Sequence, residues 1–380
     1  CTLLLAAAGL KLVRRARAPR RAWNWFAGAL LAALLARYVN LWLMLVVPVT
    51  FALLALHAQL RALFARARES WQRRPRAILR RAAIATAIGV VCIFTADLSA
   101  RTVCKLNKLQ FHSLMGHTFL WRLQFLADMP KPERDNLFDR VNAHVRSPDA
   151  GRVLGLMREM FDRGDRLSAA AVEKEGLALI RTPKTRGGRV IIDAALNSMA
   201  WSFLLPPAPE LLHVARLDFA RAQQVALSDI ASSLFATTAY YFDHPAWMQQ
   251  CANLVTFRDT TADALRTMPT QHRYFQIARG LTFKIALTIW FAALLAFAFA
   301  SQYMRRSRPE IVCYAVSLTL VGLLMVASSC LLGELLPRYT LPMWELLSIS
   351  LLTVVGSGLE LIGRRRRATR TAPARSSGKR

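Results

Sequence analysis

The feature that most constrains the fold is the alternation of long apolar stretches with short runs of arginine and lysine. Seven stretches are predominantly apolar: 1–13, 22–37, 41–58, 82–96, 283–303, 311–333 and 340–362. A helix needs roughly 20 apolar residues to cross the hydrocarbon core of a bilayer. We therefore expect an all-α polytopic membrane protein with about seven membrane spans. The first span is expected to be truncated, because the chain begins at Cys1 within an apolar run.

The apolar region 23–60 admits two interpretations, because Arg37 and Asn40 interrupt it near its middle. A single crossing would place the basic runs 11–21 and 61–81 on opposite sides of the membrane. Two short crossings place both runs on the same side, which agrees with the tendency of basic loops to stay in the cytoplasm. We therefore predict two crossings, with Arg37 reaching the outer headgroups.

The net charge of +28 is high enough for a nucleic-acid-binding protein, but its distribution argues against that function. Four runs, 11–21, 61–81, 305–308 and 364–380, hold 25 of the 51 basic residues and a single acid, Glu69. Short basic loops resist translocation, so all four runs are expected in the cytoplasm. The pattern predicts a bacterial-type inner-membrane protein with a cytoplasmic C-terminus. Membrane lipids are expected partners, and nucleic acid is not.

The composition changes between Asp97 and Gly280. This segment holds 18 of the 23 acidic residues and six of the seven histidines. Its balanced charge predicts a folded, mostly helical periplasmic domain between the fourth and fifth spans. In chain order, we predict N-terminal membrane helices over 1–96 and an extracytoplasmic domain over 97–280. C-terminal membrane helices over 281–363 and a basic cytoplasmic tail over 364–380 follow.

Apolar periodicity and breaker residues predict the elements inside this domain. Spacing of three to four residues predicts helices at 109–128, 131–145, 153–161, 168–179 and 211–241. Ser147 before Pro148 predicts a helix start, and the proline-rich segment 206–209 predicts a break between two halves. Gly187 and Gly188 predict a turn into one short strand.

Cysteine and histidine spacing gives little sign of a metal or redox centre. Cys104 and Cys251 are the two cysteines of the polar segment, and an oxidising compartment would allow a disulfide between them. Whether they are bridged stays open, because sequence does not give their distance. His112 and His117 are five residues apart, which does not stack them on one helix face. No metal site is predicted there, and no cofactor, although a divalent metal in an enzymatic site stays open.

The sequence entering the last span reads Arg338-Tyr339-Thr340-Leu341-Pro342. It resembles the C-terminal part of polytopic glycosyltransferases of the GT-C type, the protein mannosyltransferase and aminoarabinose transferase relatives. These often show Arg-Tyr, two residues and a proline entering a late helix. The resemblance implies transfer of a sugar from a polyprenyl-phosphate donor at the outer face of the inner membrane. Arg338 would pair with the donor phosphate, and Tyr339 and Glu345 would position it.

The resemblance does not supply the catalytic residues. Such enzymes usually carry their catalytic carboxylate in the first outer loop, and residues 37–40 contain no acid. Asp97, at the outer end of the fourth span, is the similarly placed candidate, and an ordinary role at a helix end is its alternative. Acids inside a membrane span are costly, so Glu345 is expected to face the bundle beneath Arg338.

A second function is compatible with the same sequence. The protein could be a non-enzymatic membrane protein whose extracytoplasmic helical domain, 97–280, binds a partner or scaffolds an envelope complex. An Arg-Tyr pair followed by proline also serves as an interfacial anchor and a helix start. The motif alone therefore leaves both functions open, and with them the sugar, the acceptor and the oligomeric state.

Overall fold

The computed structural model is helical throughout its regular elements, apart from two isolated β-bridges. It describes residues 2–14, 19–36, 38–64, 73–107, 115–165, 167, 169–180, 188–230, 280–303, 308–333 and 340–371. The predicted helical fold class is confirmed for these residues.

Five helices of the described chain are long and apolar enough to cross a membrane. They cover Leu41–Leu60, Arg76–Leu106, Phe283–Tyr303, Pro309–Leu332 and Leu341–Gly363. The protein is therefore a multi-pass membrane protein by helix length and hydropathy. The first two predicted spans form shorter helices, α1 (Thr2–Arg14) and α2 (Arg20–Ala36), of 13 and 17 residues.

The region 23–60 forms two separate helices, but of the predicted pair of crossings only Leu41–Leu60 is long and apolar enough to cross a membrane. After α2, the 3-10 helix η1 (Tyr38–Leu45) leads into α3 (Val46–Phe64). Both α2 and α3 pack against the next helix, α4 (Arg73–Leu106). Because α4 is continuous through Asp97, the predicted start of the polar domain at residue 97 falls inside a helix.

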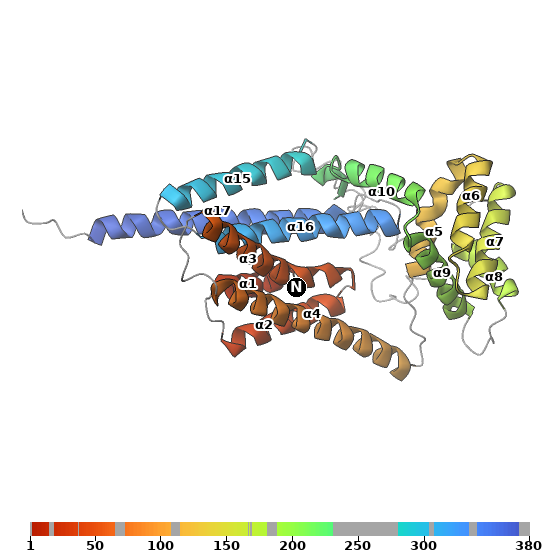
Figure 1. Cartoon of the computed structure of the whole chain (residues 1–380), viewed down its shortest axis with the longest axis horizontal. Helices are drawn as coiled ribbons and strands as arrows, with labels where there is room; N and C mark the ends of the chain where they lie inside the picture. The colour runs from red at the N-terminus through yellow and green to blue at the C-terminus, as the bar shows by residue number, and fades with distance from the viewer. Residues whose placement is uncertain are drawn as a thin grey trace, which may run out of the picture.

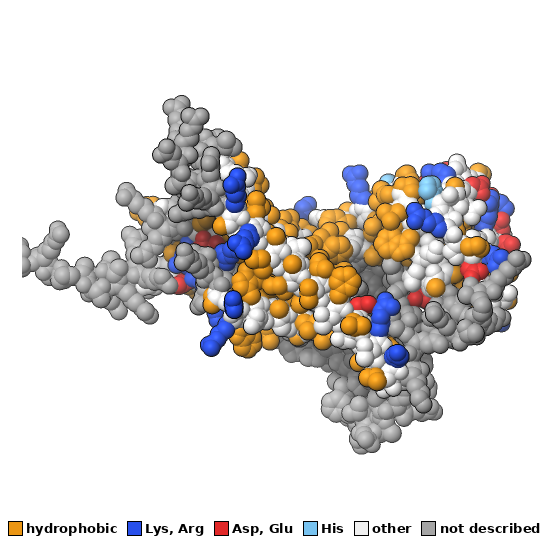
Figure 2. Space-filling view, turned by 60° about the horizontal axis from the view of Figure 1, so that its bottom comes forward, with side chains coloured by type: hydrophobic (Ala, Val, Ile, Leu, Met, Phe, Trp, Pro, Cys, Tyr) orange, Lys and Arg blue, Asp and Glu red, His pale blue; other side chains and the backbone are white. Residues whose placement is uncertain are grey.

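The basic ends of several helices gather at one end of the bundle. Arg14 of α1 and Arg308, which precedes α16, both donate to the Glu360 carboxylate of α17, at 3.0 and 3.3 Å. Arg81 of α4 donates to the carbonyl of Leu12 in α1. Figure 2 shows Lys and Arg side chains at the left end of the apolar surface, whereas the helical domain lies at the opposite end. Basic residues of α1, of α4 and of the start of α16 therefore share one end of the bundle.

The C-terminal membrane helices are α15 (Phe283–Tyr303), α16 (Pro309–Leu332) and α17 (Leu341–Thr371). The α16 span is the most buried of the five. At Gly322 its backbone approaches α17 so closely that an added Cβ would lie 3.2 Å from the Met343 Cα. A hydrogen-bonded chain also joins the three helices: Trp290 Nε1 donates to Ser350 Oγ at 2.6 Å, and Ser350 Oγ donates to the Ala315 carbonyl at 2.8 Å. Such polar contacts hold membrane helices together.

The helical domain has a hydrophobic core of its own, distinct from the two cores of the membrane bundle. Its elements are α5 (Met115–Arg122), η2 (Leu123–Asp128), α6 (Lys131–Asn142), α7 (Pro148–Asp162), α8 (Ala169–Leu179) and α9 (Gly188–Leu204). The next helix, α10 (Pro209–Ala222), lies between this cluster and the start of α15 (Figure 1).

Two local predictions for the domain are confirmed. The Ser147 side chain accepts from the Ala150 N–H at 3.5 Å and caps the start of α7. The chain also breaks between α9 and α10, across the predicted proline-rich segment 206–209.

Two other predictions are wrong. The residues after Gly188 are helical, not a strand, because Ile192, Leu196 and Met199 are buried at helical spacing. The predicted helix 211–241 ends at Ala222. After it the Ala226 N–H donates to the Asp229 carboxylate at 3.1 Å, which caps a new helical turn.

Candidate functional site

The candidate site lies where the C-terminus of α16 meets the helical domain. Arg338 and Tyr339, which are predicted to bind the sugar donor, belong to the segment 334–339. This segment lies outside the described residues. That segment leaves α16 after Gly333 and enters α17 through Thr340, which is fully buried. The structure therefore describes the residues on both sides of the segment. The site is described below from the contacts around Gly333.

A single arginine binds the end of α16. Nη1 of Arg122, the last residue of α5, donates to Asp218 Oδ2 at 2.5 Å and to the carbonyls of Cys330 and Gly333, both at 3.1 Å. The last carbonyls of a helix have no partner within the helix, and the C-terminal end of the helix dipole favours a cation. Arg122 therefore satisfies free carbonyls of α16 and balances the charge of Asp218.

This joint, which we call the Arg122 joint (Arg122, Asp218, Cys330 and Gly333), is buried. The Arg122 side chain is 4% exposed and that of Asp218 is 12% exposed. Arg221 adds a longer contact to the second Asp218 oxygen at 3.4 Å, from a largely exposed position. A buried ion pair depends on both partners, because removal of either leaves an uncompensated charge.

Apolar packing surrounds the Arg122 joint on both sides. Leu331 and Leu332, in the last turn of α16, pack against the core of the helical domain. On the other side, Ala222 of α10 packs with α15, α16 and α17 in the core of the C-terminal bundle. The helical domain is therefore attached directly to α16, and the position of Gly333 relative to the domain is fixed.

Arg122 and Asp218 were missed in the sequence, although each leaves a detectable signal. On α10 the buried positions are Leu211, Ala215, Asp218 and Ala222, so the aspartate lies on the apolar face of an amphipathic helix. Arg122 likewise follows buried Phe119 by three residues. A charge on a buried face calls for a partner, but the pattern does not identify which one.

The remaining predicted site residues lie apart from the Arg122 joint. Asp97 accepts from Arg101 Nε one turn later on α4, at 2.7 Å, and lies inside that helix and not at its end. Glu345 is exposed on α17, so its side chain does not face the bundle as expected. Neither finding brings a carboxylate to the start of the 334–339 segment.

A second polar cluster lies between α5 and α9. The Asp193 carboxylate contacts His117 Nδ1 at 3.0 Å and accepts from Asn197 Nδ2 at 3.1 Å. Asn197 Oδ1 in turn accepts from the Gly116 N–H at 2.6 Å. A Cβ on Gly116 would lie 2.5 Å from Leu196, so only glycine allows the two helices this close. The cluster fixes α5, and with it the position of Arg122.

The surface of the domain is hollowed between the ends of α6 and α9. This α6–α9 groove has a volume of about 410 Å³ and is lined by His144, Arg146, Ser198, Trp201, Ser202 and Leu205. A smaller hollow of about 250 Å³ adjoins it along the prolines 206–209. Trp201 is 51% and Leu205 65% exposed. An exposed indole beside a guanidinium can bind a ligand with both an apolar face and a negative charge.

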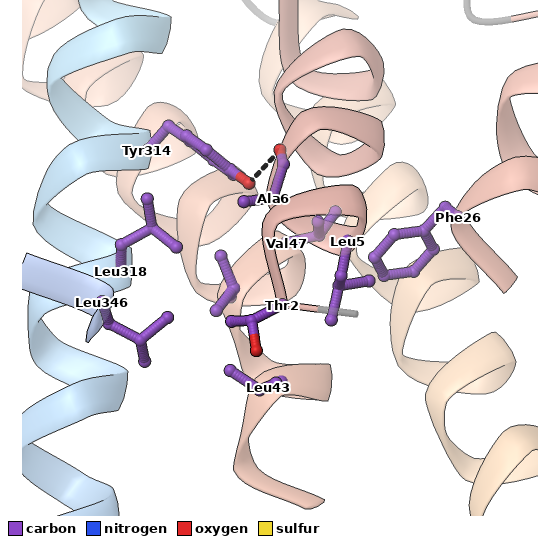
Figure 3. A pocket seen from close by; sticks show the side chains of 10 residues that line it. Thr2, Leu5, Ala6, Phe26, Leu43, Val47, Tyr314, Leu318 and Leu346 are labelled. Carbon is purple, nitrogen blue, oxygen red and sulfur yellow. Dashed lines mark hydrogen bonds between the residues drawn. The ribbon is translucent and has the colours of Figure 1, made fainter. Parts of the chain in front are cut away.

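One cavity lies inside the described part of the membrane bundle. Figure 3 shows a cavity between α1, α2, η1, α3, α16 and α17, where the Tyr314 hydroxyl donates to the Ala6 carbonyl at 2.6 Å. Its volume of about 10 Å³ is close to the minimum for one water molecule. This cavity is too small for a sugar or a lipid chain.

A metal cluster can be sought only in the described part of the chain, and the Cys104–Cys251 pair lies partly outside it. No group of three or more His, Cys, Asp or Glu side chains there is arranged to hold a metal ion. Cys104 has a free thiol, and Cys251 lies outside the described residues.

Comparison with known proteins adds no relative. No protein-family model, curated protein or solved structure matches this chain. Functional inference therefore rests on the residues and geometry described above.

Proposed function

We propose that the protein is a membrane glycosyltransferase-like enzyme that uses a polyprenyl-phosphate-linked sugar at the membrane face bearing the helical domain. The observation that carries the proposal is the position of Gly333. The Arg122 joint holds this residue beside the helical domain, at the opposite end of α16 from Arg308 and its contact with Glu360. The Arg338-Tyr339 motif follows five residues later.

The proposed chemistry assigns one main role to Arg338. In sugar transfer the acceptor oxygen attacks the anomeric carbon while the bond to the lipid phosphate breaks. Negative charge then grows on the departing phosphate, and a guanidinium can stabilise it through two parallel hydrogen bonds. Tyr339 would anchor the segment at the membrane–water interface. Glu345, exposed near the start of α17, would contact a polar part of the lipid-linked sugar.

The test is transfer of sugar from a polyprenyl-phosphate donor by membranes containing Arg338→Ala. Loss of a group that stabilises transition-state charge lowers the rate by about 100- to 1,000-fold. Arg338→Lys should retain part of the rate, because the charge is kept but not the bidentate geometry. Arg216→Ala, which removes an exposed arginine on α10, is the matched control. Unchanged transfer by Arg338→Ala at a normal protein level would remove the proposal.

A second function is favoured by the α6–α9 groove. The exposed Trp201 and Leu205 are typical of a surface that binds a partner, which supports a scaffold role for the helical domain. Trp201→Ala should then abolish complex formation while Arg338→Ala leaves it intact. Trp121→Ala, which removes an equally exposed tryptophan on α5, is the control. The opposite pattern would favour the enzyme.

A further inference from the structure

A groove runs between α1 and α2 on the outer surface of the membrane bundle. Its volume is about 570 Å³. Leu4 and Ala8 of α1 form one side, and Gly28, Ala29 and Ala32 of α2 line the other. Leu4 is 69% exposed, so in a bilayer the groove opens toward lipid. Because the α2 side of the groove consists of small residues, it leaves room for an apolar chain.

Polar groups close the groove at the basic end of the bundle. Arg21, Asn24 and Trp25 line it there, and Arg21, Trp25, Gly28 and Ala32 follow one another at helical spacing along a single face of α2. Trp25 is 72% exposed. Tryptophan is enriched at the level of lipid headgroups, so this end of the groove lies at the membrane surface.

Arg21 lies outside the ion pairs that the structure describes at this end. Arg14 and Arg308 share Glu360, whereas Arg21 makes no ion pair with any residue that the structure describes. Its charge is therefore available to an anion from the surroundings. The apolar groove that begins next to it fits the tail of a molecule whose head is anionic.

We propose that this groove binds one anionic phospholipid from the leaflet at the basic end of the bundle. Arg21 and Asn24 bind the phosphate, Trp25 packs beside the glycerol region, and one acyl chain lies along Gly28 and Ala32. The proposal is independent of the enzymatic function.

A second copy of the chain fits the groove less well, although small residues often form helix contacts. Copies inserted in the same direction would bring their basic ends together, with Arg20 and Arg21 of each facing the other. No acidic side chain of α2 can offset this repulsion, because the sequence of α2 contains no acid.

Native mass spectrometry of the full chain in detergent tests the proposal, with phosphatidylglycerol and phosphatidylcholine as probes. The unchanged protein should retain one phosphatidylglycerol more tightly than phosphatidylcholine. Arg21→Gln should weaken phosphatidylglycerol binding about five-fold, which corresponds to roughly 1 kcal/mol for one basic residue near the surface. Gly28→Leu should displace both lipids, because the new side chain fills the groove.

The controls separate lipid binding from damage to the fold. A Cβ on Gly28 meets no atom within 4 Å, so Gly28→Leu should not lower the melting temperature. Gly356→Leu, at an equally open position on α17, and Arg80→Gln, at the basic end of α4, should leave lipid binding unchanged. Equal retention of the two lipids by the unchanged protein would overturn the proposal. So would a dimer that Gly28→Leu dissociates.

Discussion

Arg122 Nη1 lies 2.5 Å from Asp218 Oδ2, and this contact between residues 96 positions apart in the chain joins helices α5 and α10. The same nitrogen donates to two carbonyls at the end of α16. One guanidinium therefore connects the helical domain, the intermediate helix α10 and the most buried membrane span. The orientation of the domain relative to the membrane depends on this contact.

Arg122→Ala should loosen the domain from the bundle. The change leaves Asp218 buried without its main partner, and breaking a buried pair in this way costs about 3–5 kcal/mol. The thermal midpoint of the full chain in detergent should fall, and amide exchange should rise in the last turn of α16.

The matched control for this prediction is Arg221→Ala. Arg221 also donates to Asp218, at 3.4 Å, but its side chain is 73% exposed. Its removal should cost about 0–1 kcal/mol. Equal effects of the two substitutions would show that the burial of Arg122 is not what makes it important.

Gly116→Ala should destabilise the helical domain by about 1–3 kcal/mol, the usual cost of overpacking. Its Cβ would lie 2.5 Å from Leu196 and 2.7 Å from the Asn197 backbone nitrogen. Gly155→Ala on α7 is the comparison, since a Cβ there meets no atom within 4 Å. That substitution should stabilise the helix by about 0.5–1 kcal/mol. Chemical denaturation of the full chain measures both, and a tolerated alanine at 116 would contradict the close approach of α5 and α9.

The domain should lose one stabilising contribution in acid. Lys131, through its hydrogen bond, and then Arg134 lower the pKa of Asp162 below its ordinary value of 3.8. A carboxylate with a lowered pKa stabilises the folded state above 3.8 and loses that contribution as the pH falls through the folded pKa. Asp162→Asn should therefore lower the thermal midpoint at neutral pH, with the difference shrinking below pH 3.8. A difference that stays constant throughout the acid range would disprove the linkage.

Reporter fusions can establish which membrane face each end of the bundle occupies. A periplasmic reporter fused within the described part of the helical domain, after Ala222, should be active. The same reporter at residue 370 should be inactive, because the basic ends stay in the cytoplasm. A cytoplasmic signal from the domain would overturn the predicted orientation.

The membrane helices α15 and α16 could be predicted closely from the sequence because their signals are long and local, whereas the predicted span 82–96 is part of a much longer helix, α4. Apolar stretches and basic ends gave α15 and α16 to within two residues, and Arg37 with Asn40 marked the break between α2 and α3. The start of α7 was equally predictable, because Ser147 caps it with its own side chain.

The parts that could not be predicted depend on contacts between distant segments. Glycines 187 and 188 suggested a turn into a strand, but burial of Ile192 and Leu196 in the domain core makes the segment helical. The α10 helix ends at Ala222 although its apolar pattern continues. The Arg122 joint joins residues from three helices, so no local pattern could specify it. Glu345 has an exposed side chain because its neighbours Trp344 and Leu346 occupy the buried face.

The contact of Arg14 with Glu360 can form only late in the synthesis of the chain. The two residues are 346 positions apart, and a ribosome adding about 5–20 residues per second needs roughly 20–70 s to make the intervening chain. The first helix is thus synthesised long before the carboxylate that binds it. The contact between α1 and α17 therefore forms only after α17 has been synthesised, whereas α1 can contact α2 and α3 earlier.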